Sequence, residues 1–265
     1  MTKNSLLLGL RRDIIKMAAH SGHVGVALSC VDILAALYVD VMACTPETVD
    51  SPERDRFILS KGHGCMALYA ILARMGFIEH QVLASYGHNG SILAEHPIAG
   101  KVAGVECATG TLGHGLAIGA GMARGLKLQG LGARVFVLMG DGECNEGSVW
   151  EAAGLASAGH LGNLIAIVDA NGLQACGSCE DVSPGTSLAN IWRGFGWEVV
   201  EADGHNYQEL VEVLGRPAVG GRPRVVICCT VKGKGVDFME GDLEWHYRPV
   251  RGDDVGESLI RLADA

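Results

Sequence analysis

The stretch that decides the fold of this chain is Val135-Phe136-Val137-Leu138-Met139-Gly140-Asp141-Gly142-Glu143-Cys144-Asn145-Glu146-Gly147. Its first five residues are apolar, which indicates a strand buried on both faces of a parallel sheet. A second apolar run, Leu164-Ile165-Ala166-Ile167-Val168, leads into Asp169-Ala170-Asn171-Gly172-Leu173. Asp141 and Asn171 therefore follow the carboxyl ends of two strands, which is where open α/β sheets bind their ligands.

These strand ends predict a site for a divalent metal and a diphosphate. The Asp141 carboxylate and the Asn171 amide oxygen suit an octahedral Mg²⁺, for which Ca²⁺ or Mn²⁺ could substitute. The turn after Asn171 would add the Leu173 carbonyl as a third ligand, and phosphate oxygens and a water would complete the shell. A helix that starts near Gly147 would direct its free amides toward the same phosphate. The alternative is a pair of ordinary strand-end turns, because Gly-Asp-Gly alone is common.

The rest of the chain predicts an α/β fold, with a mostly parallel sheet covered by helices on both faces and a single domain over residues 1–265. Apolar periodicity places strands at 56–60, 134–139, 163–168, 197–202 and 224–230. It places helices at 5–19, 31–42, 65–75, 79–86, 113–128, 147–159, 187–195 and 206–214. Residues 87–110 are expected to be irregular, and 231–265 to be a loop that becomes helical.

The expected helix over 113–128 carries Gly115, Gly119 and Ala123 at four-residue spacing. Glycine is costly inside a helix, so such a stripe indicates that another backbone or a cofactor approaches closely. We expect this stripe to pack at a subunit interface beside the cofactor.

Composition excludes several classes of function. The chain has 265 residues, 48% hydrophobic and 19% charged, with a formal net charge of −9. This charge disfavours nucleic acid or an anionic membrane as the main partner. No apolar stretch is long enough to span a membrane, and charges interrupt the amino-terminal apolar run before a signal peptide could form. The nine cysteines are odd in number, so a disulfide framework is not expected, and we expect a cytoplasmic protein.

Four of the ten histidines lie in turn-like, mostly glycine-rich contexts. They are His23, His63, His96 and His246. Any one of them could be an ordinary loop histidine. Together they are typical of a site that binds a polar substrate and moves protons near neutral pH.

The motifs of the chain resemble those of the transketolase family. The resemblance is carried by Ser21-Gly22-His23, Ser60-Lys61-Gly62-His63, Glu106-Cys107-Ala108-Thr109-Gly110-Thr111-Leu112-Gly113-His114-Gly115, Gly140-Asp141-Gly142 with Glu146-Gly147, and Asn171-Gly172-Leu173-Gln174. It covers nearly the whole chain, but only the amino-terminal, diphosphate-binding domain of a full-length transketolase. The chain is thus similar to the amino-terminal subunit of split transketolases, and the resemblance implies ketol transfer with thiamine diphosphate (ThDP) and Mg²⁺.

The resemblance also implies roles for individual residues. Asp141, Asn171 and the Leu173 carbonyl would hold the metal. Contacts with the cofactor would come from Gly142, His63, His246, Gly110, Leu112 and Glu146. The histidines His23, His63, His96 and His246 would surround the reacting carbons and donor hydroxyls, and Glu146 would belong to a proton-linked network between two active sites.

Two departures from the family pattern bear on the substrate. The family motif SGHPG reads Ser-Gly-His-Val-Gly here, with Val24 in place of proline, and LGQG has His114 in place of glutamine. No region resembles the pyrimidine-binding domain, which carries the glutamate that activates ThDP. We therefore expect a partner chain with the pyrimidine-binding and carboxyl-terminal domains, in a heterotetramer of two copies of each chain, and little turnover without it.

Three other functions remain open. The first is the alpha subunit of a ThDP-dependent 2-oxo acid or acetoin dehydrogenase, which would not be expected to carry the histidines of the SGH and KGH motifs. The second is a nucleotide-binding Rossmann protein, but Gly119-Ala120-Gly121-Met122-Ala123-Arg124-Gly125 is one residue too long for that fingerprint and lies within a helix. The third is a non-catalytic subunit that only scaffolds a partner.

Overall fold

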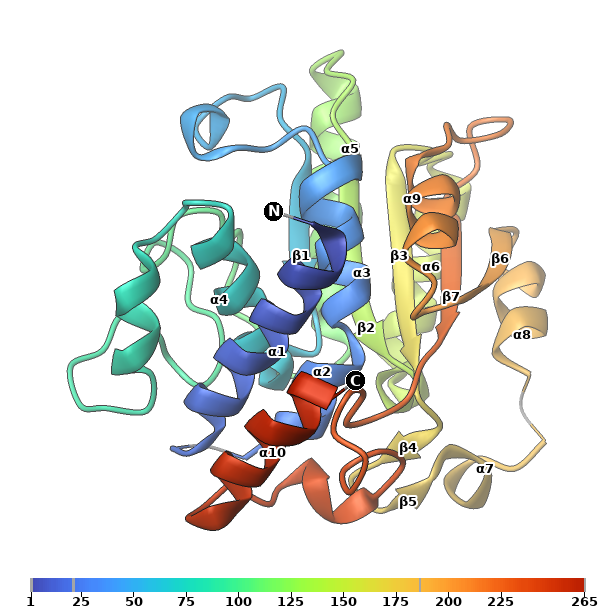
Figure 1. Ribbon diagram of the computed structural model, residues 1–265. Coiled ribbons are helices and arrows are strands. Elements are labelled where there is room, and N and C mark those ends of the chain that lie inside the picture. The colour runs from blue at the N-terminus through green and yellow to red at the C-terminus, as the bar shows by residue number, and fades with distance from the viewer. Residues whose placement is uncertain (1, 21, 186, 265) are drawn as a thin grey trace.

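Five parallel strands form the central sheet, in the order β1-β2-β3-β7-β6 (Figure 1). The computed structural model describes residues 2–20, 22–185 and 187–264. The strands are β1 (Arg56–Leu59), β2 (Val135–Gly140), β3 (Leu164–Ala170), β6 (Glu198–Asp203) and β7 (Arg224–Cys229). The register pairs Gly140 with Asp169, so β2 and β3 end side by side. The expected parallel sheet is confirmed.

Helices cover both faces of this sheet, as predicted. One face carries α1 (Lys3–Ala18), α2 (Val24–Ser29), α3 (Val31–Ala36), α4 (Cys65–Arg74) and α9 (Tyr207–Gly215). The other face carries α5 (His114–Leu128), α6 (Gly147–Ala158) and α8 (Leu188–Gly194). Phe136 and Leu138 of β2 pack in the first core, and Val135 and Val137 pack in the second. Successive side chains of a strand point to opposite faces, so a wholly apolar strand supports two cores.

The remaining elements are short or peripheral. The antiparallel pair β4 (Leu173–Gln174) and β5 (Gly177–Ser178) follows β3, and α7 (Cys179–Val182) comes next. At the carboxyl end, α10 (Asp253–Asp264) packs against α1 (Figure 1). Among the described residues, none of the helices combines the length and apolar character that a membrane crossing requires.

Two expected helices differ from the structure. The segment expected as a helix over 79–86 is a 3₁₀ helix, His80–Ser85, of which only Leu83 is buried, so no apolar stripe supports a longer α-helix. The segment expected over 31–42 is α3 followed by a π-helical stretch, Leu37–Val41. The sequence reasoning also missed α2, β4, β5 and α7, which are too short to show a full period of apolar residues.

The prediction that the glycine stripe of α5 lies at a subunit interface is wrong. A Cβ added to Gly115 would lie 2.4 Å from Ser60 Cβ, and one added to Gly119 would lie 2.5 Å from Val137 Cγ2. Ala123 is fully buried on the same side. The stripe therefore lets α5 approach β1 and β2 of its own chain closely.

Candidate active site

A cavity of about 450 Å³ lies at the carboxyl ends of the parallel strands. All the residues predicted from the sequence as metal, cofactor or catalytic residues line it. They are His23, His63, His96, Gly110, Leu112, Asp141, Gly142, Glu146, Asn171, Leu173 and His246. The structure thus brings together residues that are far apart in sequence, because His23 and His246, 223 positions apart, both line the cavity. Ser21, the first residue of the predicted Ser21-Gly22-His23 motif, lies outside the described residues.

Asp141 and the segment after β3 are held together by backbone hydrogen bonds. The Oδ1 atom of buried Asp141 accepts from Gly142 N at 2.8 Å, and its Oδ2 accepts from Gly172 N at 2.6 Å. Gly172 has φ +76°, a conformation that other residues rarely adopt. Asn171 Oδ1 accepts from Leu173 N at 3.1 Å, so the Asn171 side chain is fixed within the same turn. These bonds bring the carboxylate and the Asn171–Leu173 turn together.

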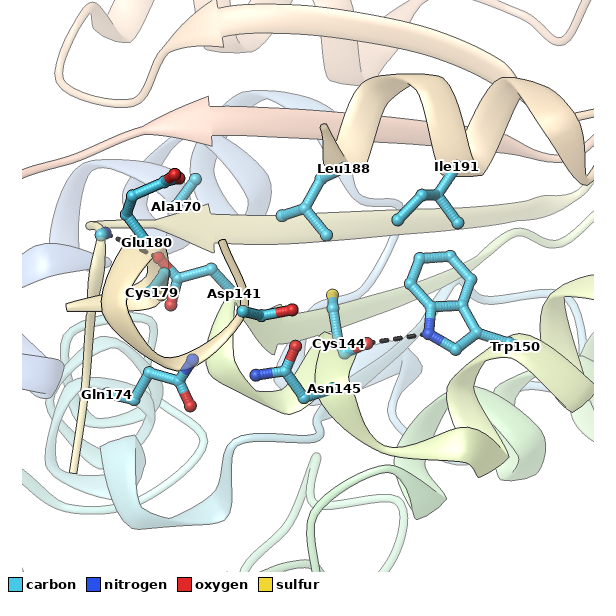
Figure 2. A pocket seen from close by; sticks show the side chains of 12 residues that line it. Asp141, Cys144, Asn145, Trp150, Ala170, Gln174, Cys179, Glu180, Leu188 and Ile191 are labelled. Atoms are coloured by element: carbon cyan, nitrogen blue, oxygen red, sulfur yellow. Dashed lines mark hydrogen bonds between the residues drawn. The ribbon is translucent and has the colours of Figure 1, made fainter. Parts of the chain in front are cut away.

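The surroundings of Asp141 favour the binding of a cation. Burial, together with the nearby Asp169 carboxylate, raises the pKa of Asp141 above its ordinary value. A carboxylate whose charge is disfavoured by burial and by a neighbouring carboxylate gains stability when a cation binds beside it. Asp141, Asn145 and Gln174 also border a second cavity, of about 350 Å³. Figure 2 shows Trp150, Leu188 and Ile191 on the opposite side of this second cavity.

Three of the four predicted histidines form a cluster of imidazole rings. The ring centroids of His23 and His63 are 5.2 Å apart, those of His23 and His246 are 5.6 Å apart, and those of His63 and His246 are 5.8 Å apart. His96 also lines the cavity and lies against Gly110, where an added Cβ would come within 2.7 Å of its ring. His23 itself has φ +65°, a left-handed conformation that turns the chain into α2.

Burial keeps the imidazole cluster uncharged near neutral pH. Burial, then the positive charge of Lys61, lowers the pKa of His63 to about 2. Burial, then Lys232, lowers the pKa of His246 to about 4. The pKa of His23 is also lowered, by burial and by His96. Neutral imidazoles can both donate and accept protons, which suits the handling of substrate hydroxyls.

Two buried lysines supply positive charge that the sequence reasoning did not assign. Lys61 follows β1, and its ammonium group contacts the Asp169 carboxylate and donates to Val26 O at 3.0 Å. Lys232 follows β7, and its Nζ donates to Leu173 O at 3.1 Å and lies 2.9 Å from His246 Nδ1. Burial, together with Lys61, lowers the pKa of Lys232 to about 8. A lysine directly after a buried strand was the sequence signal that could have identified both.

Glu143 is a third residue that the sequence reasoning missed. Its buried carboxylate accepts from Ser60 Oγ, from Gly113 N at 2.8 Å and from Gly140 N at 3.3 Å. These donors belong to the end of β1, the start of α5 and the end of β2. Glu143 thereby fixes the loop that carries Gly110 and Leu112 against the Gly140–Gly147 segment. Its place inside the Gly-Asp-Gly-Glu motif was the available signal.

Tyr247 is a further lining residue that was not predicted. Its ring centroid lies 5.0 Å from that of His23 and 4.6 Å from that of His246, and the residue is 62% exposed. Glu146, which was predicted, is exposed at the amino-terminal cap of α6 and borders the same cavity. These two residues mark the solvent side of the site.

The residues present fit a diphosphate with its metal. Lys61 and Lys232 add positive charge near the cavity, and the oxygens of Asp141, Asn171 and the Leu173 carbonyl are of the kind that a divalent cation binds. Within the described chain, the buried His23 Nδ1 has no hydrogen-bond partner, which leaves a polar atom available to a ligand. No group of three or more His, Cys, Asp and Glu side chains suited to a metal occurs among the described residues. A metal held by Asp141, Asn171 and the Leu173 carbonyl would have positions left for phosphate oxygens.

A comparison with known protein families supports a ThDP-binding role for this site. Residues 6–263 match the family described as "Transketolase, thiamine diphosphate binding domain". The chain belongs to this family, and the match supports ThDP as its cofactor.

Two relatives that this chain covers over most of their length are subunits of transketolases. The sequence is 43% identical over 258 residues to an apulose-4-phosphate transketolase subunit of Actinobacillus succinogenes, covering 96% of this chain and 94% of that relative. It is 40% identical to a 6-deoxy-6-sulfo-D-fructose transketolase subunit of a Clostridium species, covering 85% of this chain and 82% of the relative. At the level of the family, the chain is the amino-terminal subunit of a split transketolase, and therefore part of a transferase.

Solved structures show how much of a complete transketolase this chain represents. It superposes on the transketolase of Campylobacter jejuni with a TM-score of 0.88 at 29% identity, covering 98% of this chain and 42% of that one. A Pichia stipitis transketolase variant gives a TM-score of 0.91 at 27% identity and is covered over 40% of its length. The dehydrogenase-type alternative is not favoured by these relationships.

Proposed function

We propose that this chain binds the diphosphate of ThDP through a divalent metal and works with a partner chain as a two-component transketolase. The observation that carries the proposal is the single cavity in which the ends of β2 and β3 meet the imidazole cluster. Asp141, Asn171 and the Leu173 carbonyl would hold Mg²⁺, or Ca²⁺ or Mn²⁺ in its place. In the structure, Lys232 donates to the Leu173 carbonyl oxygen. When a metal ion binds this oxygen, we expect the Lys232 ammonium group to turn toward the diphosphate.

The remaining lining residues would orient the cofactor and substrate. Gly142, Gly110, Leu112 and Glu146, which line the cavity, would place backbone and carboxylate groups near the cofactor. His63 and His246 would contact the diphosphate as neutral hydrogen-bond donors. His23 and His96 would bind donor hydroxyls and pass protons between them.

Bound ThDP would supply the carbanion chemistry that carries a two-carbon ketol unit from a ketose to an aldose or another aldehyde. The ketose would be a sugar or sugar phosphate, and its identity would depend on this chain's histidines and on the partner. Relatives named for apulose-4-phosphate and for 6-deoxy-6-sulfo-D-fructose support a specialised ketose. We also propose that the enzyme is cytoplasmic.

The partner would contribute the pyrimidine-binding and carboxyl-terminal domains. The Actinobacillus succinogenes relative is named as one subunit of its transketolase, which supports the existence of such a chain, and the solved transketolases extend well beyond the length that this chain covers. We propose a heterotetramer with two copies of each chain. Glu146, exposed at the edge of the cavity, would then face the second active site of the assembly.

The metal-ligand assignment is tested by ThDP binding. Asp141→Ala should lower Mg²⁺-dependent ThDP affinity about 100-fold, because it removes the only carboxylate of the proposed ligand set. Isothermal titration calorimetry of the chain with its partner, with and without Mg²⁺, measures this loss. Glu212→Gln, an exposed carboxylate of α9, is the matched control. Unchanged Mg²⁺ dependence in Asp141→Ala would contradict the assignment.

A further inference from the structure

The loop after β7 that carries Lys232 is anchored by residues that do not themselves line the cavity. Thr230 Oγ1 donates to Asp169, Val231 N donates to His205 Nε2 at 2.9 Å, and Gly233 N donates to Gly25 O at 3.0 Å. Arg11 Nε also donates to Lys234 O at 3.2 Å. The position of the Lys232 backbone is thus set by groups outside the cavity as well as inside it.

His205 is the anchor of this loop whose hydrogen bond depends on its protonation state. A backbone N–H can only donate, so His205 Nε2 must be the acceptor from Val231. The ring proton then lies on Nδ1, which donates to Asp32 Oδ2 at 2.9 Å. Asp32 Oδ2 also accepts from Arg11 Nη2 at 2.6 Å. The three side chains form a continuous path from α1 through α3 to the Val231 backbone.

We propose that His205, Asp32 and Arg11 form a brace that positions Lys232 for the cofactor, and that the brace holds only while His205 Nε2 is unprotonated. Protonation turns Nε2 into a donor that faces the Val231 N–H, so the hydrogen bond to the loop is lost. The loop then loses the anchor next to Lys232, whose Nζ contacts Leu173 O and His246 Nδ1. His205, Asp32 and Arg11 are positioning residues, because none of them lines the cavity.

Charged groups from several elements surround His205. They are Asp32 of α3, Arg11 of α1, Asp203 at the end of β6, and Lys234 and Glu240 of the loop after β7. Asp32 lies in direct contact with the ring, and its carboxylate can accept a hydrogen bond from the imidazolium without moving. The protonated ring thus keeps its bond to Asp32 while it loses its bond to Val231. Protonation of His205 would therefore release the loop after β7 and leave the packing of α3 unchanged.

Two substitutions distinguish the role of His205 as a hydrogen-bond acceptor from the effect of its protonation. In His205→Gln, the amide oxygen can reach the place of Nε2 and accept from Val231 N–H, but it does not titrate. In His205→Ala the acceptor is absent at every pH. His80→Gln is the matched control, since His80 Nε2 lies 3.0 Å from the buried Asp13 carboxylate on α1 and does not touch the loop.

The first readout is amide hydrogen exchange of residues 229–234 in the chain without cofactor. We expect faster exchange, after correction for intrinsic rates, at pH 5.5 than at pH 7.5 in the wild type and in His80→Gln. His205→Gln should exchange slowly at both values of pH, and His205→Ala should exchange fast at both. A His205→Gln profile that follows the wild type overturns the proposal.

The second readout is Mg²⁺-dependent ThDP affinity of the chain with its partner, and it rests on the proposed function. Relative to His205→Gln, the wild type should lose about tenfold in affinity between pH 7.5 and pH 5.5, which is typical for loss of an outer support of a metal site. His205→Ala should be about tenfold weaker than His205→Gln at pH 7.5. Equal pH profiles in the wild type and His205→Gln overturn the proposal. Absence of ThDP binding by the wild type contradicts the proposed function alone, because amide exchange still tests the brace.

Discussion

His63 shows how one buried side chain links the site to the stability of the fold. Its pKa is lowered to about 2 by burial and by the charge of Lys61, whereas the unfolded chain restores a pKa near its ordinary value of about 6.5. The unfolded state therefore binds a proton below pH 6.5 that the native state does not bind. The contribution of His63 to the free energy of unfolding is complete above about pH 6.5 and declines as the pH falls.

This linkage predicts a specific loss of pH dependence in His63→Asn. The wild type should lose up to about 1.4 kcal/mol of stability per pH unit through His63 below pH 6.5, and the variant should lack that contribution. Urea unfolding at pH 7.5, 6 and 5 measures the difference in slope. An identical slope in the two proteins would show that folding does not lower the pKa of His63.

At the scale of elements, α5 approaches the sheet closely enough to exclude a side chain. Gly119 faces Val137 at a distance that leaves no room for a Cβ, whereas Gly121 on the same helix has nothing within 4 Å of an added Cβ. Gly119→Val should therefore lower the free energy of unfolding by about 1–3 kcal/mol through overpacking. Gly121→Ala should raise it by up to about 1 kcal/mol, because alanine favours the helix. Thermal or urea unfolding of the two variants and the wild type measures these changes. Equal stability of Gly119→Val and Gly121→Ala would contradict the packing described for α5.

The elements also show what sequence patterns could and could not predict. The runs 135–139 and 164–168 are apolar at every position, so their identity as buried strands and the site at their ends were readable. The glycine stripe of α5 correctly indicated a close approach, but a pattern cannot say whether the neighbour belongs to the same chain. Glu143 and Lys232 were missed because their roles depend on partners brought from other elements, Gly113 and Leu173 among them.

At the scale of the whole molecule, residues from distant segments of this chain line the cavity. The resemblance to the family assigns the glutamate that activates ThDP to the pyrimidine-binding domain. We therefore expect the purified chain with ThDP and Mg²⁺ to show no more than about 1% of the turnover measured with its partner, because loss of a general acid–base group costs about 100-fold or more. Ketose donor consumption with and without the partner measures this ratio. Robust turnover by the chain alone would place the missing group within it.

The buried pair of Lys61 and Asp169 restricts how this sequence can change over generations. Asp169 also accepts from Ser29 Oγ at 2.5 Å and from Thr230 Oγ1, so the carboxylate links β3 to α2 and to the loop after β7. Loss of either charge alone leaves the other buried and unpaired, at a cost of about 3–5 kcal/mol, whereas joint replacement by apolar residues of similar volume can be nearly neutral for stability. A single substitution at either position is therefore expected to destabilise the fold, even where the double replacement does not. A descendant that abandons the pair is expected to have changed both residues, or to have acquired compensating stability first.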